Sequence, residues 1–534
     1  MENQIMKFTA LRENGQTTSN GSESDQPIDA EVIDMQDIVK INESEFAVKY
    51  YIFALLPNGQ IVCTGNLYLP AILESLKDLG FYKRRRHDGP FMFLQEKDNI
   101  ISAKDPSEMK DAFFGKHLRY LATHLIFYLG TRPHLMTVEE QQQVYLKNAS
   151  RVFNQKFLEH LETHTKPIMA DTRHNSYFFF KNVVVTAGED GLACSTYADL
   201  QEKCVWEDHI IQRDFNLVEE FDQCHYAQFI ENVAGERQGK IDAFKSGIGY
   251  LLNNYNSPSR SQAVVCYDEE PSLVGEPNGG TGKGVFCKAI KQLRDTFKLD
   301  GKNIRRDDKF KFQGITERTQ LFWIDDAADN FPFEMLHSAI TDGFTVEKKY
   351  QHQFYIPAEK SPKVVLCSNT ILSSMGKTNI RRQFILEFSD FYSQRIVTGA
   401  EEPIKDIHGG IFFDDDSWGQ AEWDKFFSFM INCAVYFHQN GLKPYTQVGR
   451  ERSRLVQTTN EAFAGWVENV LGEPEGEYDT KELFDQYKLQ TGEVDPTVTA
   501  RRFNGWITVY AEFKGWELRS RESNGRKKIS FLRP

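Results

Sequence analysis

A glycine-rich loop constrains this chain more than any other segment. It reads Pro277-Asn278-Gly279-Gly280-Thr281-Gly282-Lys283-Gly284, after a strand-like AVVCY and before a helix-like VFCKAIKQL. Closely spaced glycines let several backbone N–H groups converge on phosphate oxygens without clashes from Cβ atoms. Lys283 adds a positive charge for the β- and γ-phosphates, and the helix that begins near Gly284 adds its positive N-terminal end. The predicted nucleotide-binding residues are therefore Gly279, Gly280, Thr281, Gly282, Lys283 and Gly284.

The loop departs at both ends from the common pattern G-x-x-x-x-G-K-[ST]. Pro277 replaces the first glycine, and Gly284 stands where a magnesium-binding hydroxyl is expected. Taken alone, the segment has a plain alternative, which is a glycine-rich turn on a surface loop.

Two carboxylates close the apolar segment LFWIDD, at Asp325 and Asp326. The carboxyl ends of parallel strands meet at one edge of a sheet, where a Mg²⁺ ligand and a water-activating base belong. We expect Asp325 to hold Mg²⁺ through water and Asp326 to polarise the attacking water. An ordinary strand followed by a helix cap would account for only one of the two carboxylates.

Polar side chains also flank the next two strand-like segments. Asn369 follows KVVLC, and Arg381 and Arg382 precede QFILEF. An amide at a neighbouring strand end can hydrogen-bond the γ-phosphate or the lytic water. An arginine donated across a subunit interface would stabilise the transition state, by about 10³–10⁵ in rate. In this order of elements we favour that role over a solvated pair of arginines.

The segment between the acids and Asn369 bears on what ATP would be used for. Residues 340–350 read as a turn and a hairpin, with Lys348, Lys349 and Tyr350 near its tip. A basic loop with an aromatic tip can grip a phosphodiester backbone. An ordinary exposed hairpin is the alternative.

This order of motifs resembles the superfamily 3 helicases, which are AAA+ motors, and in particular the poxvirus-type primase-helicases of phages and bacterial mobile elements. The resemblance covers residues 217–440 and includes the GYLL and RRQFILEFSDFY segments. It implies an α/β P-loop NTPase core, ATP and Mg²⁺ as cofactors, and a homo-hexameric ring around single-stranded DNA. It assigns Lys283 to phosphate, Asp325 and Asp326 to metal and water, and Asn369 to sensing. Lys348 or Lys349 would be the pore lysine, and Arg381 or Arg382 the arginine finger.

The last part of the chain predicts a second nucleic-acid contact. Residues 480–490 and 498–513 read as two helices, and WELRSRE and RKKISFL as a hairpin, which together indicate a winged helix. Residues 499–534 carry nine Lys and Arg against three acids. Duplex or origin DNA is the expected partner, and a role in protein contacts is the alternative. The expected DNA-binding side chains there are Arg501, Arg502, Arg526, Lys527 and Lys528.

Composition limits the remaining possibilities. The 534 residues carry a net charge of −13, which excludes a uniformly basic nucleic-acid coat. Eight cysteines without a CxxC pair favour reduced thiols. No signal sequence or membrane span is expected, so we predict a cytoplasmic protein. The resemblance implies a bacterial or phage-infected host cell. The wide spacing of Cys194, Cys204 and Cys224-His225 argues against zinc, and HLETH around His160 and His164 is not the HExxH pattern.

We expect five parts along the chain. Residues 1–30 should be a disordered tail, 31–215 an α/β domain of unknown role, and 216–256 a helical collar or linker. Residues 257–450 should form the ATPase and 451–534 the winged helix. Within the second part we expect a hairpin around Pro57-Asn58-Gly59 and helical periodicity over 108–162.

The predicted function is an ATP-dependent DNA helicase that acts in replication of a phage, plasmid or integrated element. An AAA+ switch that assembles on DNA without unwinding it is the main alternative, and Gly284 is the residue that favours it. A small-molecule kinase would leave the lysine hairpin and the C-terminal basic residues unexplained. No archaeal-type primase motif is found, so a separate primase or polymerase is a further candidate partner.

Overall fold

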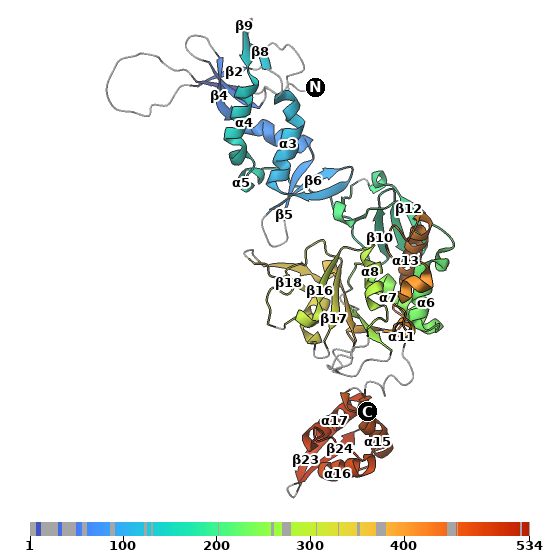
Figure 1. Ribbon diagram of the computed structural model, residues 1–534. Helices are drawn as coiled ribbons and strands as arrows, with labels where there is room; N and C mark the ends of the chain where they lie inside the picture. The colour runs from blue at the N-terminus through green and yellow to red at the C-terminus, as the bar shows by residue number, and fades with distance from the viewer. Residues whose placement is uncertain are drawn as a thin grey trace. The chain divides into compact units, whose positions relative to one another are not determined.

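The fold is described from a computed structural model (Figure 1). The described residues are 7–11, 30–34, 50–55, 61–85, 91–121, 125–129, 132–200, 202–257, 261–269, 279–305, 307–328, 331–349, 353–369, 381–445, 455–456, 458–523 and 526–532. The chain divides into two compact units. One comprises Met1–Met169 with Thr196–Ile210, and the other Ala170–Ser195 with Ile211–Pro534.

The first unit combines mostly antiparallel strands with amphipathic helices. Its elements are β1 (Lys7–Leu11), β2 (Ala30–Asp34), β3 (Tyr51–Leu55), β4 (Ile61–Leu67), α2 (Leu69–Asp78), β5 (Phe81–Arg85), β6 (Phe91–Lys97), β7 (Ile100–Lys104), α3 (Pro106–Leu121), β8 (Leu125–Leu129), β9 (Arg132–Met136), α4 (Val138–Val152), α5 (Gln155–Leu158) and β13 (Val205–Trp206). Helices α2, α3 and α4 bury Leu76, Phe113 and Tyr145 in one cluster. A sheet of β13, β7, β6 and β5 lies in the same unit.

Two expectations for this unit are wrong in part. Strand β1 lies within the predicted tail 1–30 and pairs with β2, because a distant partner supplies hydrogen bonds that local composition does not show. The predicted helical stretch 108–162 is interrupted by the β8–β9 hairpin. A short apolar run such as LIFYL fits a strand as well as a helix, so periodicity alone does not separate them. The predicted hairpin of β3 and β4 is confirmed, and its turn lies outside the described residues.

The boundary predicted at residue 215 differs from the structure. Strands β10 (Asn175–Phe180), β11 (Val184–Gly188), β12 (Gly191–Ser195) and β14 (Ile210–Ile211) form one sheet, and residues 170–195 belong to the second unit. The ring of Phe180 stacks on Phe215 at 4.6 Å and meets Phe427 edge-on at 5.1 Å. These long-range contacts cannot be seen in a local reading of the sequence.

The second unit is organised around a parallel sheet. Its strands are β15 (Ala263–Asp268), β16 (Thr296–Asp300), β17 (Leu321–Ala327), β20 (Lys363–Ser368) and β21 (Gln383–Phe388). Across the described part of the chain their order is β16-β17-β20-β15-β21, and each strand pairs in parallel with its neighbours. Strand β20 therefore separates the strand before the glycine-rich loop from the strand that ends in two acids. This mixed α/β arrangement is consistent with a P-loop or AAA+ core.

Helices cover one face of this sheet. They include α6 (His225–Ala234), α7 (Gln238–Leu252), α8 (Lys283–Lys291) and α13 (Gln420–Asn440). A Cβ atom on Gly249 of α7 would lie 2.1 Å from the Cys433 carbonyl oxygen of α13, so only glycine permits this helix crossing. Residues 216–256, expected to be a collar or linker, thus pack into the core of the sheet. Shorter helices α11 (Phe391–Val397) and α12 (Pro403–His408) follow β21.

The other face of the sheet carries a second apolar cluster. Phe344, Val346 and Ile356 belong to it, from the hairpin of β18 (Gly343–Val346) and β19 (Phe354–Pro357). The hairpin predicted over 340–350 therefore begins and ends later than expected, because Ile340 and Thr341 belong to helix α9 (His337–Thr341).

The C-terminal segment has its own core around Phe463, Tyr487 and Trp506. Its elements follow the order α15 (Glu461–Leu471), β22 (Glu477–Asp479), α16 (Thr480–Thr491), α17 (Ala500–Phe513), β23 (Glu517–Ser523) and β24 (Arg526–Leu532). The two predicted helices and the predicted hairpin are confirmed as elements. Along the described residues, no helix combines the length and the apolar character needed to cross a bilayer.

Candidate nucleotide-binding site

The glycine-rich loop turns directly into helix α8. Gly280 and Gly282 have φ angles of +90° and +104°, a region that side-chain-bearing residues rarely adopt. A Cβ atom on Gly282 would also lie 2.8 Å from the Phe229 ring, and one on Gly280 would lie 2.4 Å from Ile396. Glycine is therefore required at both positions for the loop to reach the first turn of α8. Pro277 and Asn278 lie outside the described residues.

Lys283, the first residue of α8, is held by a carboxylate at the end of β15. Its Nζ donates to Oδ1 of Asp268 and, at 3.1 Å, to the Thr281 hydroxyl, which itself donates to Asp268 at 2.6 Å. Burial raises the pKa of the Asp268 carboxyl, whereas Lys283 and Thr281 favour its charged form. Oδ2 of Asp268 is buried and has no hydrogen-bond partner in the described part of the chain. Asp268 thus positions the lysine in the structure as it stands.

The paired acids lie at an irregularity in strand β17. The register between β17 and β20 shifts between Ile324 and Ala327, and Asp326 has a φ angle of +53°. A β-bulge of this kind re-aims the side chains of the strand that carries it. Gly301 packs against the bulge, where an added Cβ would lie 2.9 Å from the Asp325 carbonyl oxygen. Both acidic residues line the cavity described below.

Each acid also has a lysine partner. Lys298 of β16 lies 2.6 Å from Asp325, and Lys302 of the following 3-10 helix lies 2.5 Å from Asp326. Asp326 raises the pKa of Lys302, chiefly through their hydrogen bond. A bound cation would compete with these two ammonium groups for the same oxygens.

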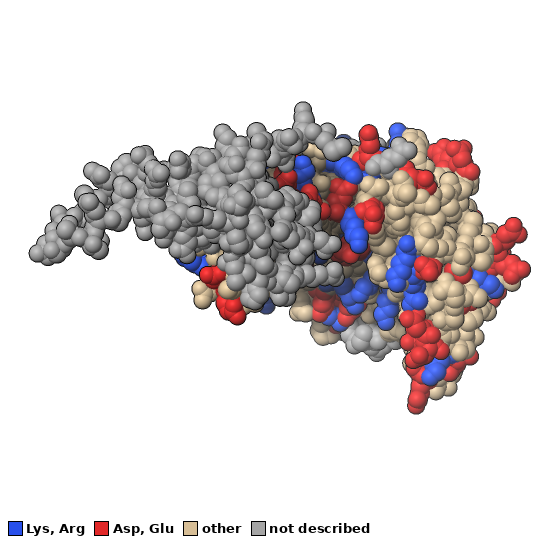
Figure 2. Space-filling model, turned by 90° about the horizontal axis from the view of Figure 1, so that it is seen from above, with Lys and Arg blue, Asp and Glu red and all other residues tan. Residues whose placement is uncertain are grey.

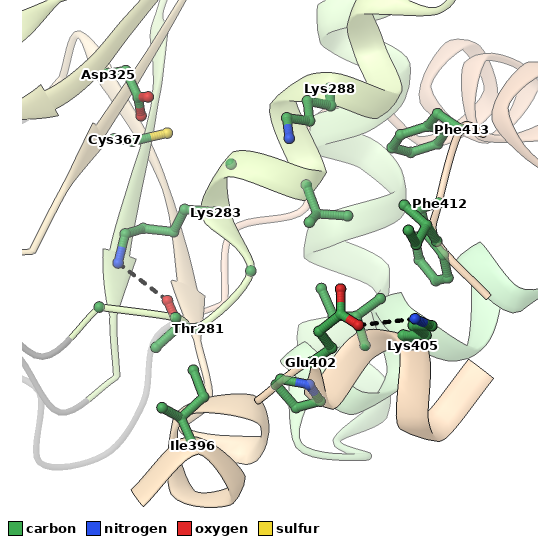
Figure 3. Close-up of a pocket in the computed structure, with 18 of the residues that line it drawn as sticks. Thr281, Lys283, Lys288, Asp325, Cys367, Ile396, Glu402, Lys405, Phe412 and Phe413 are labelled. Carbon is green, nitrogen blue, oxygen red and sulfur yellow. Dashed lines mark hydrogen bonds and ion pairs between the residues drawn. The ribbon is translucent and has the colours of Figure 1, made fainter. Parts of the chain in front are cut away.

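A cavity of about 640 Å³ brings most of the predicted site together. Loop residues 279–284 line it, as do Asp325, Asp326 and Asn369. Lys288 of α8 and Lys405 of α12 add further cations, and Lys405 pairs with Glu402 at 2.9 Å. Figure 3 shows Lys283 and Thr281 in contact where the loop enters α8, with Asp325 and Cys367 on neighbouring strands.

The remaining wall of the cavity is apolar. Ile396, Ile404, Ile411, Phe412 and Phe413 line it. In Figure 3, Phe412 and Phe413 lie across α8 from Asp325. One side of the cavity can thus accept phosphates and a cation, and the other side can accept a flat apolar group such as a nucleobase.

The donor set of this cavity is suited to magnesium. Mg²⁺ prefers carboxylate, hydroxyl and water oxygens. Asp325 and Asp326 supply carboxylates to the cavity, and Thr281 supplies a hydroxyl from the loop. Asp268 does not line the cavity, but its buried Oδ2 beside Lys283 has no hydrogen-bond partner in the described part of the chain. These residues could hold the ion although Gly284 offers no side chain.

Arg381 and Arg382 do not join this cavity. They line a different one of about 610 Å³, together with Tyr250, Gln262 and Asn440. They precede β21, and the carbonyl of Arg382 accepts a hydrogen bond from Ala263 at the start of β15. The two arginines therefore lie at the amino edge of the sheet, whereas the glycine-rich loop lies at its carboxyl edge.

The predicted DNA-binding residues are likewise separate from the cavity. Lys348 and Lys349 occupy the β18–β19 loop, where Lys349 is exposed and its Nζ lies 5.8 Å from the centre of the Phe310 ring. Arg501, Arg502 and Lys527 are exposed in the C-terminal segment.

Acidic neighbours partly neutralise the C-terminal basic residues. Arg526 pairs with Glu482 at 2.9 Å, and Arg521 with Glu477 at 2.5 Å. Residues 455–534 contain eleven basic and thirteen acidic side chains. Elsewhere on the molecule, Figure 2 shows basic and acidic side chains interspersed over the described part of the face in view.

Sequence reasoning missed several residues in and around the cavity. Asp268, Lys298 and Lys302 do not line it but pair with residues that do, and only the fold reveals those partnerships. Asp268 had a usable signal, since it ends the strand directly before the loop. The wall of Ile396, Phe412 and Phe413 had none, because those residues come from separate segments after β21.

Comparisons with known proteins assign no family. No family model matches the chain, and no curated protein matches it. Among solved structures, the apo C-terminal region of NrS-1 has a TM-score of 0.41 and 9% identity, covering 86% of this chain and 98% of that one. The JCV helicase has a TM-score of 0.25 and 10% identity, covering 45% and 65%. Drosophila ORC bound to DNA has a TM-score of 0.17 and 10% identity, covering 60% and 92%. At such scores these likenesses carry no argument about function.

Proposed function

We propose that the protein is an ATP hydrolase that couples turnover to the unwinding of DNA. The observation that carries the proposal is the single cavity lined by Lys283, Asp325, Asp326 and Asn369. A glycine-rich loop, a lysine, paired acids and an amide are the parts that phosphoryl transfer to water requires.

The chemistry would begin with an exchange of partners at Lys283. The Lys283 ammonium group would donate to the triphosphate in place of Asp268. The loop amides and the N-terminal end of α8 would bind the same phosphates. Asp325 would hold Mg²⁺, which would neutralise charge on the phosphate oxygens. Asp326 would polarise the attacking water, and Asn369 would hydrogen-bond the γ-phosphate or that water.

Within one subunit, Arg381 and Arg382 would be poorly placed for this reaction. Because Arg381 and Arg382 line a cavity at the opposite edge of the sheet, we propose that they complete the site of a neighbouring copy. This arrangement supports a ring of copies, with a homo-hexamer as the expected form. Single-stranded DNA would pass through the ring against Lys348 and Lys349.

The C-terminal segment would supply a second DNA contact. Its exposed Arg501, Arg502 and Lys527, and the partly buried Lys528, suit the backbone of duplex or origin DNA. Arg526 would contribute less than its charge suggests, because Glu482 and Asp479 already lie beside it.

An AAA+ switch that assembles on DNA without unwinding it is the second candidate. The absence of a side chain at Gly284 favours this reading, because a weaker magnesium site would slow hydrolysis more than binding. The exposed lysine in the β18–β19 loop favours the motor, since a switch does not need a gripping loop.

The first test is ATP hydrolysis by the full chain with and without single-stranded DNA. Lys283→Ala should abolish turnover, and Lys291→Ala, an exposed position on the same helix, should not. Arg382→Ala subunits mixed into wild type should lower activity more than in proportion to their share. Slow hydrolysis that is indifferent to DNA and additive in mixtures would contradict the motor and leave the switch.

A further inference from the structure

Three side chains that can bind a metal ion meet inside the first unit, apart from the nucleotide cavity. They are Glu96 on β6, His164 after α5, and Cys204 directly before β13. One ligand atom from each lies within 4.8 Å of the other two. The side chains of His164 and Glu96 are only 2% and 13% exposed, and Cys204 is fully buried. A buried group of this kind differs from the acidic clusters that are common on surfaces.

The distances match the spacing of ligands around a tetrahedral ion. Zinc bonds of about 2.0–2.3 Å at a tetrahedral angle place neighbouring ligand atoms about 3.3–3.7 Å apart. Nε2 of His164 lies 3.1 Å from Oε2 of Glu96 and 3.7 Å from Sγ of Cys204. The three atoms are thus close enough to share one ion after small adjustments.

The geometry also separates a metal site from a nucleophilic triad. In a triad the nucleophile and the acid occupy opposite nitrogens of the imidazole ring. Here the thiol and the carboxylate both approach the same atom, Nε2 of His164. Convergence on one atom is what a shared cation would produce.

The surrounding groups orient the ligands, and some of their contacts would have to change when a metal binds. Lys166 contacts Oε1 of Glu96, which leaves Oε2 toward the histidine. Arg84 lies 3.3 Å from Nδ1 of His164 and 3.2 Å from the Lys166 carbonyl oxygen. Metal binding would release the Cys204 thiol proton and move the imidazole proton from Nε2 to Nδ1. The Arg84 guanidinium would then have to give up its contact with Nδ1 and keep only its contact with the Lys166 carbonyl oxygen.

We propose that Glu96, His164 and Cys204 bind one thiophilic divalent cation of the zinc class. Thiolate and imidazole ligands favour such ions over Mg²⁺. The ligands come from three separate segments, which explains why sequence spacing gave no finger pattern. Because Cys204 lies in the returning segment Thr196–Ile210, the ion would fasten that segment to β6. The proposal does not depend on ATP hydrolysis.

The test uses Co²⁺ as a spectroscopic substitute for Zn²⁺ on the full-length protein. We expect one Co²⁺ per chain, with a thiolate-to-cobalt absorption band that Zn²⁺ removes. Loss of a group that only hydrogen-bonds a metal ligand weakens metal binding about 10–100-fold, so loss of a ligand itself should weaken it at least as much. Cys204→Ser should remove the band, and His164→Asn should weaken binding by about 100-fold or more. Cys194→Ser and His160→Asn, two exposed positions, are the matched controls and should bind like wild type.

Further measurements keep the test decisive. If Cys204→Ser does not fold, Glu96→Gln is the ligand variant whose cobalt binding is compared with that of wild type. Far-UV circular dichroism checks that this variant is folded. Lys283→Ala should keep full metal binding, so failure of the ATPase proposal would not affect this one. Wild type that binds no Co²⁺, or that shows the same cobalt spectrum and affinity as folded ligand variants, would overturn the proposal.

Discussion

Gly284 lacks the hydroxyl that commonly binds magnesium at its position, yet its surroundings leave room for one. A Cβ atom added there meets no described atom within 4 Å, unlike one added at Gly282. The missing hydroxyl is therefore not imposed by crowding. At the residue scale, this position is where the rate of the proposed hydrolysis can be adjusted.

We expect Gly284→Ser to change the free energy of unfolding by no more than about 0.5 kcal/mol. If the new hydroxyl reaches Mg²⁺, about 1.4 kcal/mol of added transition-state stabilisation would raise kcat about tenfold. Steady-state ATP hydrolysis and thermal unfolding measure the two effects. Gly282→Ser is the control and should lose nucleotide binding, because of its φ of +104° and the nearby Phe229 ring. Equal damage from both substitutions would contradict the loop geometry.

The left-handed backbone at Asp326 gives a second prediction. Asparagine tolerates this conformation, so Asp326→Asn should keep the fold and lower kcat about 10²–10⁴-fold, the range for loss of a general base. Asp326→Gly should lose the same activity but raise the free energy of unfolding by about 1 kcal/mol, because glycine accepts a φ of +53° without strain. Activity retained by the asparagine variant would remove Asp326 from the proposed mechanism.

At the scale of elements, close packing between helices depends on single glycines. We expect Gly249→Ala to destabilise the second unit by at least about 2 kcal/mol, since its Cβ would lie 2.1 Å from the Cys433 carbonyl oxygen. Gly465→Ala in α15 is the matched control, because an added Cβ there meets nothing within 4 Å. That control should be stabilised by about 0.5–1 kcal/mol through helix propensity. Thermal unfolding monitored by circular dichroism distinguishes the two signs.

The sequence predicted continuous apolar strands better than strands of mixed polarity and domain boundaries. Strands β15, β17, β20 and β21 were predicted, because strands buried on both faces read as continuous apolar runs. Strand β16 was missed because TFKLD alternates polar and apolar residues. The boundary near residue 215 was wrong because Phe180 packs against distant Phe427. Of the candidate site, the loop, the acids and Asn369 were predicted to meet and do line one cavity, whereas the partners Asp268, Lys298 and Lys302 needed the fold.

At the scale of the whole molecule, one buried lysine should contribute to the pH dependence of the free energy of unfolding. Lys363, at the start of β20, donates to the Tyr255 carbonyl at 2.8 Å, and its Nζ lies 4.0 Å from the centre of the Tyr250 ring. Burial lowers the pKa of Lys363 to about 7, against an ordinary value of 10.5, although Asp171 acts in the opposite direction. Between these pH values the unfolded chain binds more protons, so this lysine makes the folded state less stable as pH falls from 10.5 to 7.

Lys363→Met should therefore stabilise the protein most near pH 7. The difference from wild type should shrink by up to about 1.4 kcal/mol per pH unit as the pH rises toward 10. Lys360→Met, at an exposed position three residues earlier, should show no such trend. Urea unfolding at pH 7, 8 and 9 measures the difference, and a constant offset across that range would contradict a depressed pKa at Lys363.

The glycine-rich loop and the arginine pair lie at opposite edges of one sheet, separated by the six residues of β15, about 17 Å. Each copy therefore has a direction, with a nucleotide cavity at one end and an arginine pair at the other. If neighbouring copies share sites as proposed, an open row would always leave one cavity without arginines and one arginine pair without a cavity. Closing the row would complete the last site without adding any protein. Turnover per chain should then rise as copies assemble and reach a plateau only when the rows have closed into rings.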